Sequence, residues 1–156
     1  MIDISVPGFG ELHFSHLVLD FNGTLAGDGL LIDGVEKRLA RLAAQLRIHI
    51  VTADTFGSVQ QMFADTPYTV FILPAGEEEK SKASYVQELG VQSCVCIGNG
   101  RNDRLMLKES ALGIAVQQQE GLALEALLAA DLITTSIIDA LDLLIHPLRL
   151  TASLRN

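Results

Sequence analysis

The sequence predicts an α/β fold in which a doubly wound parallel sheet lies between two layers of helices. Short apolar segments of β-type composition alternate with helical segments along the chain, and strands joined by helices pair in parallel through right-handed crossovers. No repeat or linker interrupts this alternation. A chain of 156 residues is long enough for one core and too short for two, so residues 1–156 are expected to form a single domain.

The individual elements follow from the spacing of apolar residues. A buried strand is expected at residues 17–21 and a helix at 33–46, where Asp33 followed by Glu36 is typical of a capping box. Residues 27–31 are expected to form a small hairpin over the rim of the sheet. The remaining expected elements are strands at 48–51, 70–73, 94–97, 113–116 and 132–134, and helices at 55–64, 78–89, 102–110, 120–129 and from 136 onward.

Composition and charge exclude several classes of function. Apolar residues make up 49% of the chain, which excludes a disordered protein. The net charge of -8 repels the phosphate backbone of nucleic acid and anionic lipid, so neither is an expected partner. The apolar region 122–145 is interrupted by acidic residues that the centre of a bilayer would not tolerate. With no secretory signal in residues 1–10, the cytoplasm is the expected location.

The cysteines and histidines lack the spacing of a metal site. Cys94 and Cys96 are two residues apart in an expected strand, so both thiols should point to the same face and stay buried and reduced. No further ligand accompanies them, as a structural zinc site would require. The histidines are scattered along the chain and are interpreted as core or surface residues: His13, His16, His49 and His146.

Polar side chains gather where the expected strands end. In a doubly wound sheet, ligands bind at the carboxyl ends of the strands. Residues 20–25 follow the first strand, 52–54 the second and 98–103 the fourth, while Lys80 and Lys82 open the helix between. Together they place carboxylates, a hydroxyl, an amine and glycine-flanked amides on one rim. That combination suits phosphate chemistry, because it offers Mg²⁺ ligands, donors to phosphoryl oxygens and a carboxylate that can attack phosphorus.

The order and spacing of these motifs resemble the haloacid dehalogenase-like (HAD) hydrolase superfamily, and within it the phosphorylation domain of P-type ATPases. Asp20-Phe21-Asn22-Gly23-Thr24-Leu25 resembles the first motif. Thr52 resembles the second motif, and Lys82 resembles the third better than Lys80 does. Residues 98–103 are similar to the Gly-Asp-Gly-x-Asn-Asp signature of the ATPases. The resemblance covers nearly the whole chain and implies a Rossmann-like HAD fold.

The resemblance also implies a role for each matching residue. Asp20 would be the nucleophile that accepts the phosphoryl group, while Thr52 and Lys82 would hold its oxygens. Mg²⁺ would be the cofactor. Its expected ligands are Asp20, the backbone carbonyl of Asn22, Asn99 and Asp103. Substrate contacts are expected from Gly23, Thr24, Ala53 and Asn102.

Two positions depart from the family pattern. Phosphatases of the superfamily usually have a second Asp two residues after the nucleophile, where this chain has Asn22. An amide cannot shuttle a proton at neutral pH, and general acid–base help is worth about 10² to 10⁴ in rate. The ATPases share this departure, having Thr there. The second departure is Asn99, where the ATPase signature has Asp, so the metal loses one charged ligand.

The short intervals from Asp20 to Thr52 and from Thr52 to Lys82 leave no room for a cap domain. An open site of this kind suits a macromolecular phosphate, or a phosphorylated small molecule with a neighbouring subunit closing the site in a homo-oligomer. The expected function is a Mg²⁺-dependent phosphohydrolase that acts through a phosphoaspartate on Asp20. The alternative is a regulatory or binding module of the same fold with little turnover. Asp54 is interpreted as a helix cap, whereas for Arg101 a substrate contact and a solvent-facing position are both open.

Overall fold

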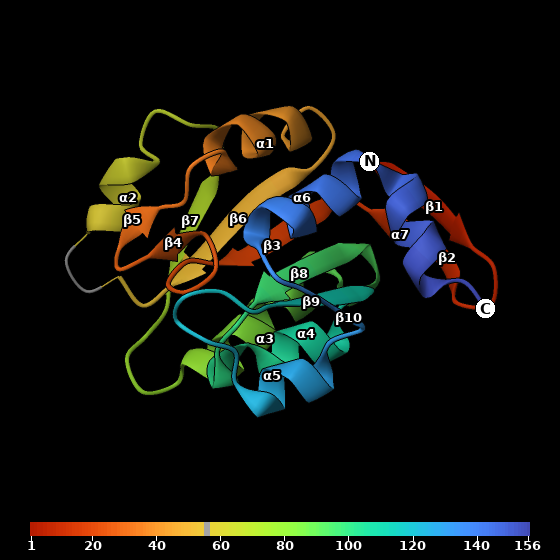
Figure 1. Ribbon diagram of the computed structural model, residues 1–156. Helices are drawn as coiled ribbons and strands as arrows, with labels where there is room; N and C mark the ends of the chain where they lie inside the picture. Colours follow the sequence, from red (N-terminus) through yellow and green to blue (C-terminus); the bar gives the residue numbers. More distant parts are fainter. Residues whose placement is uncertain (55–56) are drawn as a thin grey trace.

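The computed structural model describes residues 1–54 and 57–156, and at its centre is a six-stranded parallel sheet (Figure 1). From the central strand β3 the chain builds β6 and β7 on one side, and then β8, β9 and β10 on the other, which gives the order β10-β9-β8-β3-β6-β7. The predicted doubly wound α/β sheet is therefore confirmed. The strands are β3 (His16–Asp20), β6 (Arg47–Thr52), β7 (Thr69–Ile72), β8 (Cys94–Gly98), β9 (Leu112–Val116) and β10 (Leu132–Thr134).

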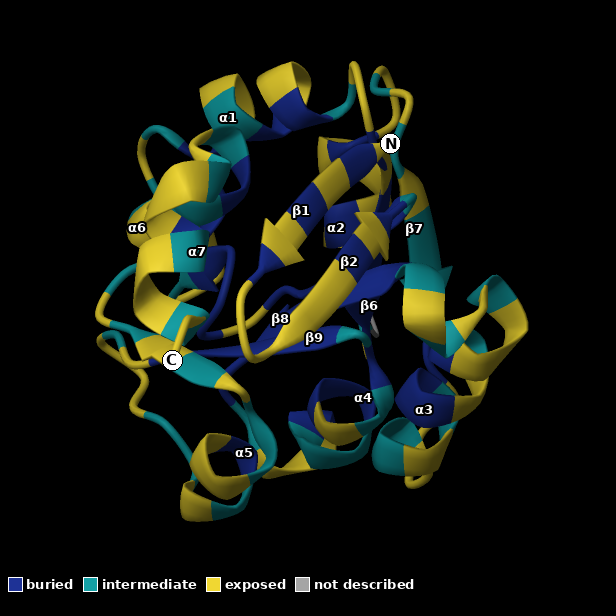
Figure 2. Cartoon of the chain, turned by 90° about the vertical axis from the view of Figure 1, so that its right-hand side faces the viewer, coloured by how far each residue is buried: buried dark blue, intermediate teal, exposed yellow. Residues whose placement is uncertain are grey.

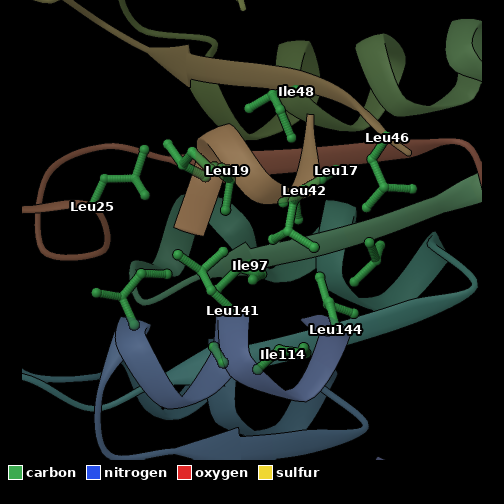
Figure 3. Packing of buried hydrophobic residues seen from close by; sticks show 14 of the residues in the cluster. Leu17, Leu19, Leu25, Leu42, Leu46, Ile48, Ile97, Ile114, Leu141 and Leu144 are labelled. Atoms are coloured by element: carbon green, nitrogen blue, oxygen red, sulfur yellow. The ribbon is translucent and has the colours of Figure 1, made fainter. Parts of the chain in front are cut away.

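Helices cover both faces of the sheet (Figure 1). Because side chains alternate along a strand, Leu17 and Leu19 of β3 face one helical layer, where Figure 3 shows them among buried leucines and isoleucines. Val18 faces the other layer together with Cys94 and Cys96, which are buried and unpaired. The first layer contains α1 (Val35–Leu42) and α6 (Ile137–Ile145), and the second contains α3 (Glu78–Leu89), α4 (Arg104–Glu109) and α5 (Leu124–Ala129).

Short elements complete the fold. The hairpin expected over the rim is confirmed as β4 (Ala26–Gly27) paired with β5 (Leu30–Leu31). The start of the helix expected at 55–64 includes residues 55 and 56, which lie outside the described residues, and α2 spans Ser58–Met62. Two single turns of 3-10 helix are present at η1 (Val91–Ser93) and η2 (Arg101–Asp103). In the part of the chain that the structure describes, no helix has both the length and the apolar character needed to cross a membrane.

The capping box predicted at Asp33 and Glu36 is wrong. The residue that caps α1 is Gly34, which has a φ of 86° and no side-chain hydrogen bond to the helix. Glycine adopts this left-handed conformation without steric cost, so the chain turns sharply into the helix one residue after Asp33. The helix also ends earlier than predicted, at Leu42, and the buried Leu46 lies in the turn that leads into β6.

Two C-terminal helices also differ from their predicted ranges. The helix expected from residue 120 begins at Leu124, because Gly121 has a φ of 82° and its carbonyl accepts a hydrogen bond from Asn99. The helix expected from residue 136 starts with Ser136 as its N-cap and is then split. Pro147 ends α6 and begins α7 (Pro147–Leu154), since proline cannot donate the backbone hydrogen bond that a continuous helix needs.

An N-terminal hairpin was missed. Strands β1 (Ile2–Val6) and β2 (Gly10–Phe14) pair with each other, apart from the central sheet, and lie beside α7 (Figures 1 and 2). Figure 2 shows their buried and exposed residues in alternation. This period of two was present in the sequence as Ile2, Ile4 and Val6, with polar residues between them, and it is the typical signal of a half-buried strand.

Two histidines on neighbouring strands form a buried hydrogen-bonded chain with a tyrosine. His16 Nδ1 lies 3.0 Å from His49 Nε2, and His49 Nδ1 lies 2.8 Å from the hydroxyl of Tyr85 on α3. Burial lowers the pKa of His49 to about 4, and the nearby His16 and Arg47 act in the same direction. These histidines are core residues, as expected from the sequence, and they lie near the amino end of the sheet.

Candidate functional site

The candidate site lies at the carboxyl ends of β3, β6 and β8, where the strand order reverses. Asp20 is the last residue of β3, Thr52 is the last residue of β6, and Asn99 follows β8 directly. Parallel strands end at the same edge of a sheet, so the topology brings together residues that are distant in sequence. This is the edge at which doubly wound sheets bind ligands.

Lys82 connects two carboxylates at the centre of the site. It lies in the early part of α3, its side chain is only 1% exposed, and its Nζ donates to Asp20 Oδ1 at 2.6 Å and to Asp103 Oδ1 at 2.5 Å. A longer contact of 3.4 Å reaches Asn102 Oδ1. Lys80, the alternative for the lysine motif, is exposed. The structure therefore places Lys82, and not Lys80, against Asp20.

Burial and neighbouring charges shift the pKa values of Lys82 and Asp103 in this group of three. Burial by itself would lower the pKa of Lys82, but the adjacent Asp20 and Asp103 outweigh burial and raise it above its ordinary value. Burial and the negative charge of Asp20 raise the pKa of Asp103 to about 6, against the opposite effect of Lys82. With two carboxylates and one ammonium, the centre carries a net negative charge when all three groups are ionised, which favours a further cation.

Thr24 joins the loop after β3 to the loop after β8. Its buried hydroxyl lies 3.1 Å from Asp20 Oδ2 and 3.1 Å from Asn99 Oδ1. Asn99 Nδ2 in turn donates to the carbonyl of Gly121. This packing requires glycine at position 23, because its φ is 79° and a Cβ there would lie 2.3 Å from Asn99 Nδ2. The Gly-Thr pair of the first motif is thus explained by close approach of two loops.

Asp103 is held rigidly by main-chain donors. It is fully buried, and its Oδ2 accepts hydrogen bonds from the backbone amides of Asn99 at 3.0 Å and Gly100 at 2.8 Å. A Cβ at Gly98 would lie 2.5 Å from the carboxyl carbon of Asp103. The glycines of the 98–103 segment therefore let the chain wrap closely around this carboxylate, which fixes the position of Lys82.

The remaining residues predicted for the site line its open rim. Thr52 is buried at the end of β6, the strand that pairs with β3. The side chains of Asn22, Ala53 and Asn102 are exposed, so they are accessible to a substrate that approaches the edge of the sheet. Among the described residues, no hydrogen bond joins the side chain of Asn22 to Asp20.

Two residues at the rim take structural roles. Asp54 accepts hydrogen bonds from Ser58 and from the backbone amide of Val59, so it satisfies a donor in the first turn of α2, although the N-cap residue of that helix is Gly57 and not Asp54 as predicted. Arg101 is exposed and lies 3.3 Å from Glu125, so its guanidinium faces solvent.

Gln118 is a site residue that the sequence interpretation missed. Its Nε2 donates to the carbonyls of Gly23 and Thr24, at 3.2 and 2.9 Å, and its Oε1 accepts from the backbone amide of Ile137. It therefore ties the loop after β9 to the loop after β3. The signal was its position two residues beyond the end of an expected strand, the criterion already applied to the other strand ends.

The donor set fits a hard cation such as Mg²⁺, although it is poor in charge. Asp20 Oδ2 and Asn99 Oδ1 both face the hydroxyl of Thr24, so two side-chain oxygens lie close together at the end of β3. Mg²⁺ binds oxygen ligands and usually keeps several waters. Within residues 1–54 and 57–156, no three His, Cys, Asp or Glu side chains gather in a way that could hold a metal. Amide and main-chain oxygens would therefore have to complete the set.

Comparison with solved structures identifies the fold. A cobalt-bound deoxy-D-mannose-octulosonate 8-phosphate phosphatase from Haemophilus influenzae superimposes with a TM-score of 0.71 at 14% identity, over 86% of this chain and 88% of that one. The 3-deoxy-D-manno-octulosonate 8-phosphate phosphatase from Moraxella catarrhalis, in complex with magnesium ion, phosphate ion and a KDO molecule, superimposes with a TM-score of 0.68 at 18% identity. This match covers 90% of this chain and 91% of that one. A zinc-transporting PIB-type ATPase gives 0.63 at 23% identity, over 79% of this chain and 20% of that one. The chain has the HAD fold, and its described residues include no cap domain.

Comparison with known protein sequences identifies a family for the chain. No family model matches it. It is 39% identical over 85 residues to the uncharacterized protein MJ0073 of Methanocaldococcus jannaschii, a match that spans 52% of this chain and 91% of that protein. A second protein of the same organism, the uncharacterized MJ0072, is 46% identical over 39 residues, which is 25% of this chain and 89% of that protein. The chain therefore belongs to the same family as MJ0073.

Proposed function

We propose that this protein is a Mg²⁺-dependent phosphohydrolase that transfers a phosphoryl group first to Asp20 and then to water. The observation that supports this most strongly is the position of Asp20. Asp20 ends the central strand at the point where the strand order reverses. Lys82 is hydrogen-bonded to one of its carboxylate oxygens and Thr24 to the other. A carboxylate held in this way is oriented to attack a phosphoryl group that approaches the open rim.

In the first step, Asp20 attacks the phosphorus in line with the leaving alcohol. The bond between phosphorus and the alcohol oxygen breaks as the bond to Asp20 forms, and the departing alkoxide takes a proton from water. Lys82 and Thr52 hold the equatorial oxygens on which negative charge develops, and fixed donors of this kind lower the barrier without reorganisation. In the second step, water attacks the phosphorus, and Asp20 is released as a carboxylate together with inorganic phosphate.

The metal would be held by Asp20, the carbonyl of Asn22, Asn99 and Asp103. Asp103 already accepts three hydrogen bonds, from Lys82, Asn99 and Gly100, and a carboxylate offers about four acceptor positions. One position is therefore left for the metal or for a water on it. When bound, Mg²⁺ supplies positive charge that neutralises the phosphoryl oxygens.

The amide of Asn22 sets the kinetic character of the proposed enzyme. It is exposed and cannot protonate a leaving alcohol, so alcohols of high pKa should depart slowly. A general acid in this place would be worth about 10² to 10⁴ in rate. The same amide favours the second candidate function, a regulatory module whose phosphoaspartate persists. Asn22 cannot take a proton from the hydrolytic water and so cannot activate it.

The proposed substrate is a phosphorylated small molecule, and nucleic acid is not an expected substrate. The net charge of -8 repels a polyanion, whereas a single phosphomonoester needs only the local cations of the site. A homo-oligomer is part of the proposal. Leu124 and Leu128 of α5 are 64% and 77% exposed, so they are not core residues and are available to a subunit interface.

The test is hydrolysis of 4-nitrophenyl phosphate with and without Mg²⁺, with Asp20→Asn as the control. The aryl leaving group departs without protonation, so wild-type turnover is expected despite Asn22. Turnover should depend on Mg²⁺ and be lost in Asp20→Asn. Intact mass measured on the same samples separates the two candidates, because a stable phosphorylated protein with little turnover favours the regulatory module. Unchanged hydrolysis in Asp20→Asn would contradict both.

A further inference from the structure

A cavity lies beside residues 21–25, the loop that follows the proposed nucleophile Asp20, and the proposed phosphoryl chemistry does not use it. Its volume is about 280 Å³, and it is bounded by Gly23, by the β4–β5 hairpin at Gly27 and Ile32, and by Gln119, Glu120 and Thr135. The hairpin follows β3, residues 119 and 120 follow β9, and Thr135 follows β10. These segments place the cavity at the same carboxyl edge of the sheet as Asp20.

The cavity is adjacent to the nucleophile. Gly23 forms part of its wall, and the next residue, Thr24, is hydrogen-bonded to Asp20 Oδ2. Consecutive Cα atoms are about 3.8 Å apart. Gly23 in the cavity wall is therefore the immediate neighbour of Thr24, whose side chain contacts the carboxylate of Asp20. The cavity wall therefore lies next to a residue that contacts Asp20 Oδ2.

Hydrogen bonds hold the walls in place before any ligand binds. Gln118 links the loop after β9 to the carbonyls of Gly23 and Thr24. The backbone amide of Asp28, at the tip of the hairpin, donates to Glu120 Oε1 at 2.9 Å. The hairpin and the loop after β9, which both contribute to the lining, are therefore tied together, so the cavity is a preformed site of the kind that binds small ligands.

The lining selects against negative charge. The lining is more apolar than polar and includes Gly23, Gly27 and Ile32, and no Lys, Arg or His side chain is among the described residues that form it. The polar groups are the amide of Gln119, the hydroxyl of Thr135 and the carboxylate of Glu120, whose Oε2 is left over from the bond to Asp28. These groups suit hydroxyls and repel a carboxylate. The volume is close to the lower end of the range of about 300 to 1,000 Å³ for small-molecule pockets.

We propose that this cavity binds the alcohol portion of the substrate, and that the substrate is a monophosphate of a compact, uncharged, hydroxylated alcohol such as a sugar or polyol. The proposal rests on the proposed phosphohydrolase function, and it assigns substrate selection to Glu120 and Gln119. Glu120 acts by charge: it accepts hydroxyl hydrogen bonds and disfavours a second anionic group on the substrate.

The test compares two substrates that differ at a single carbon. Sorbitol 6-phosphate has a terminal CH₂OH where 6-phosphogluconate has a carboxylate, and the two are otherwise the same. Steady-state kcat/KM is measured for both, and for 4-nitrophenyl phosphate, in the wild type, Glu120→Lys, Glu120→Gln and a control, Glu11→Lys. The control makes the same charge change on β2, in the N-terminal hairpin that is separate from the central sheet. Far-UV circular dichroism establishes that each variant is folded.

The wild type is expected to prefer sorbitol 6-phosphate by at least about ten-fold, which corresponds to about 1.4 kcal/mol. Glu120→Lys should lower this preference about ten-fold or more, Glu120→Gln should lower it less, and Glu11→Lys should leave it unchanged. Glu120→Gln keeps an acceptor for the amide of Asp28, so it reports on charge even if Glu120→Lys fails to fold.

Three results would overturn the proposal. If 4-nitrophenyl phosphate is hydrolysed but the two polyol phosphates react equally, the cavity does not select substrates, while the phosphohydrolase function stands. If Glu11→Lys changes the preference as much as Glu120→Lys does, the effect belongs to the overall charge and not to the cavity. If the wild type hydrolyses none of the three esters, the proposed function fails, and the cavity proposal fails with it.

Discussion

Replacing Lys82 with methionine removes the only cation that contacts Asp20 and Asp103 among the described residues. Methionine is unbranched and flexible, so it fills most of the same space without the charge. Asp103 is fully buried and Asp20 is 8% exposed. The variant therefore leaves two carboxylates close together with little water to screen them, and the folded state must either bear this repulsion or take up a proton.

The expected loss of stability is large at neutral pH and smaller in acid. Removing one partner of a buried ion pair costs about 3 to 5 kcal/mol, and Lys82 contacts two carboxylates at 2.6 and 2.5 Å, so the upper part of this range is expected at pH 7. Burial and Asp20 already raise the pKa of Asp103 to about 6, and loss of the lysine raises it further. An acid whose pKa is higher in the folded state gains stability as the pH falls, so the loss should shrink by about 1 to 2 kcal/mol at pH 5.

The assay is urea unfolding followed by far-UV circular dichroism at pH 7 and pH 5. The matched control is Lys80→Met, which removes the same charge from an exposed position on the same helix and should change the unfolding free energy by less than about 0.5 kcal/mol. A Lys82→Met protein that is unfolded at pH 7 and folded at pH 5 meets the same expectation. A loss of less than about 1 kcal/mol at pH 7, or a loss that grows in acid, would refute the reasoning.

Three further predictions concern the general acid, a buried histidine and a tight helix–strand contact. Asn22→Asp should raise turnover of alkyl phosphates by about 10² or more, with a smaller gain for 4-nitrophenyl phosphate; equal gains for both would argue against a missing acid. The folded-state pKa of His49, about 4, lies below its unfolded value, so the unfolded chain binds more protons between about pH 6.5 and 4 and stability falls as the pH drops through that window. The wild type should unfold with a higher free energy than His49→Gln at pH 7, and this difference should shrink by about 1 to 2 kcal/mol at pH 4.5, a figure reduced because solvent partly screens the ring. A difference in unfolding free energy that stays constant with pH would count against a buried neutral ring. Gly113→Ala would bring a Cβ to 2.2 Å from the backbone carbonyl of Leu107, so a loss of about 1 to 3 kcal/mol is expected in thermal or urea unfolding, and an unchanged midpoint would refute the close packing.

Most of the central sheet could be predicted because each strand is a short apolar segment followed by a polar one. The range expected for α3 agrees with the structure at both ends, and β10 does as well. The errors arose where one residue or a distant contact decides the geometry. Gly34 starts α1 through a left-handed turn, and a hydrogen bond from Asn99 helps keep Gly121 out of α5. Helical periodicity carries no information about such contacts.

The candidate site was predictable in its residue types but not in its connections. The motif spacing singled out Asp20, Lys82 and Asp103, and the structure brings their side chains together. Spacing alone could not show that Thr24 lies between Asp20 and Asn99, because that contact depends on how two loops pack. Gln118 was missed for the same reason, since its partners are backbone carbonyls from a distant part of the chain.

The central claim is that Asp20 carries the phosphoryl group. The most direct measurement is to mix the protein with Mg²⁺ and 4-nitrophenyl phosphate, quench in acid within the first turnovers, and determine intact mass and the modified peptide by mass spectrometry. The account predicts one phosphoryl group, on the peptide that contains Asp20, and none in Asp20→Asn. A phosphoryl group on another residue, or release of nitrophenol by Asp20→Asn at the wild-type rate, would contradict it.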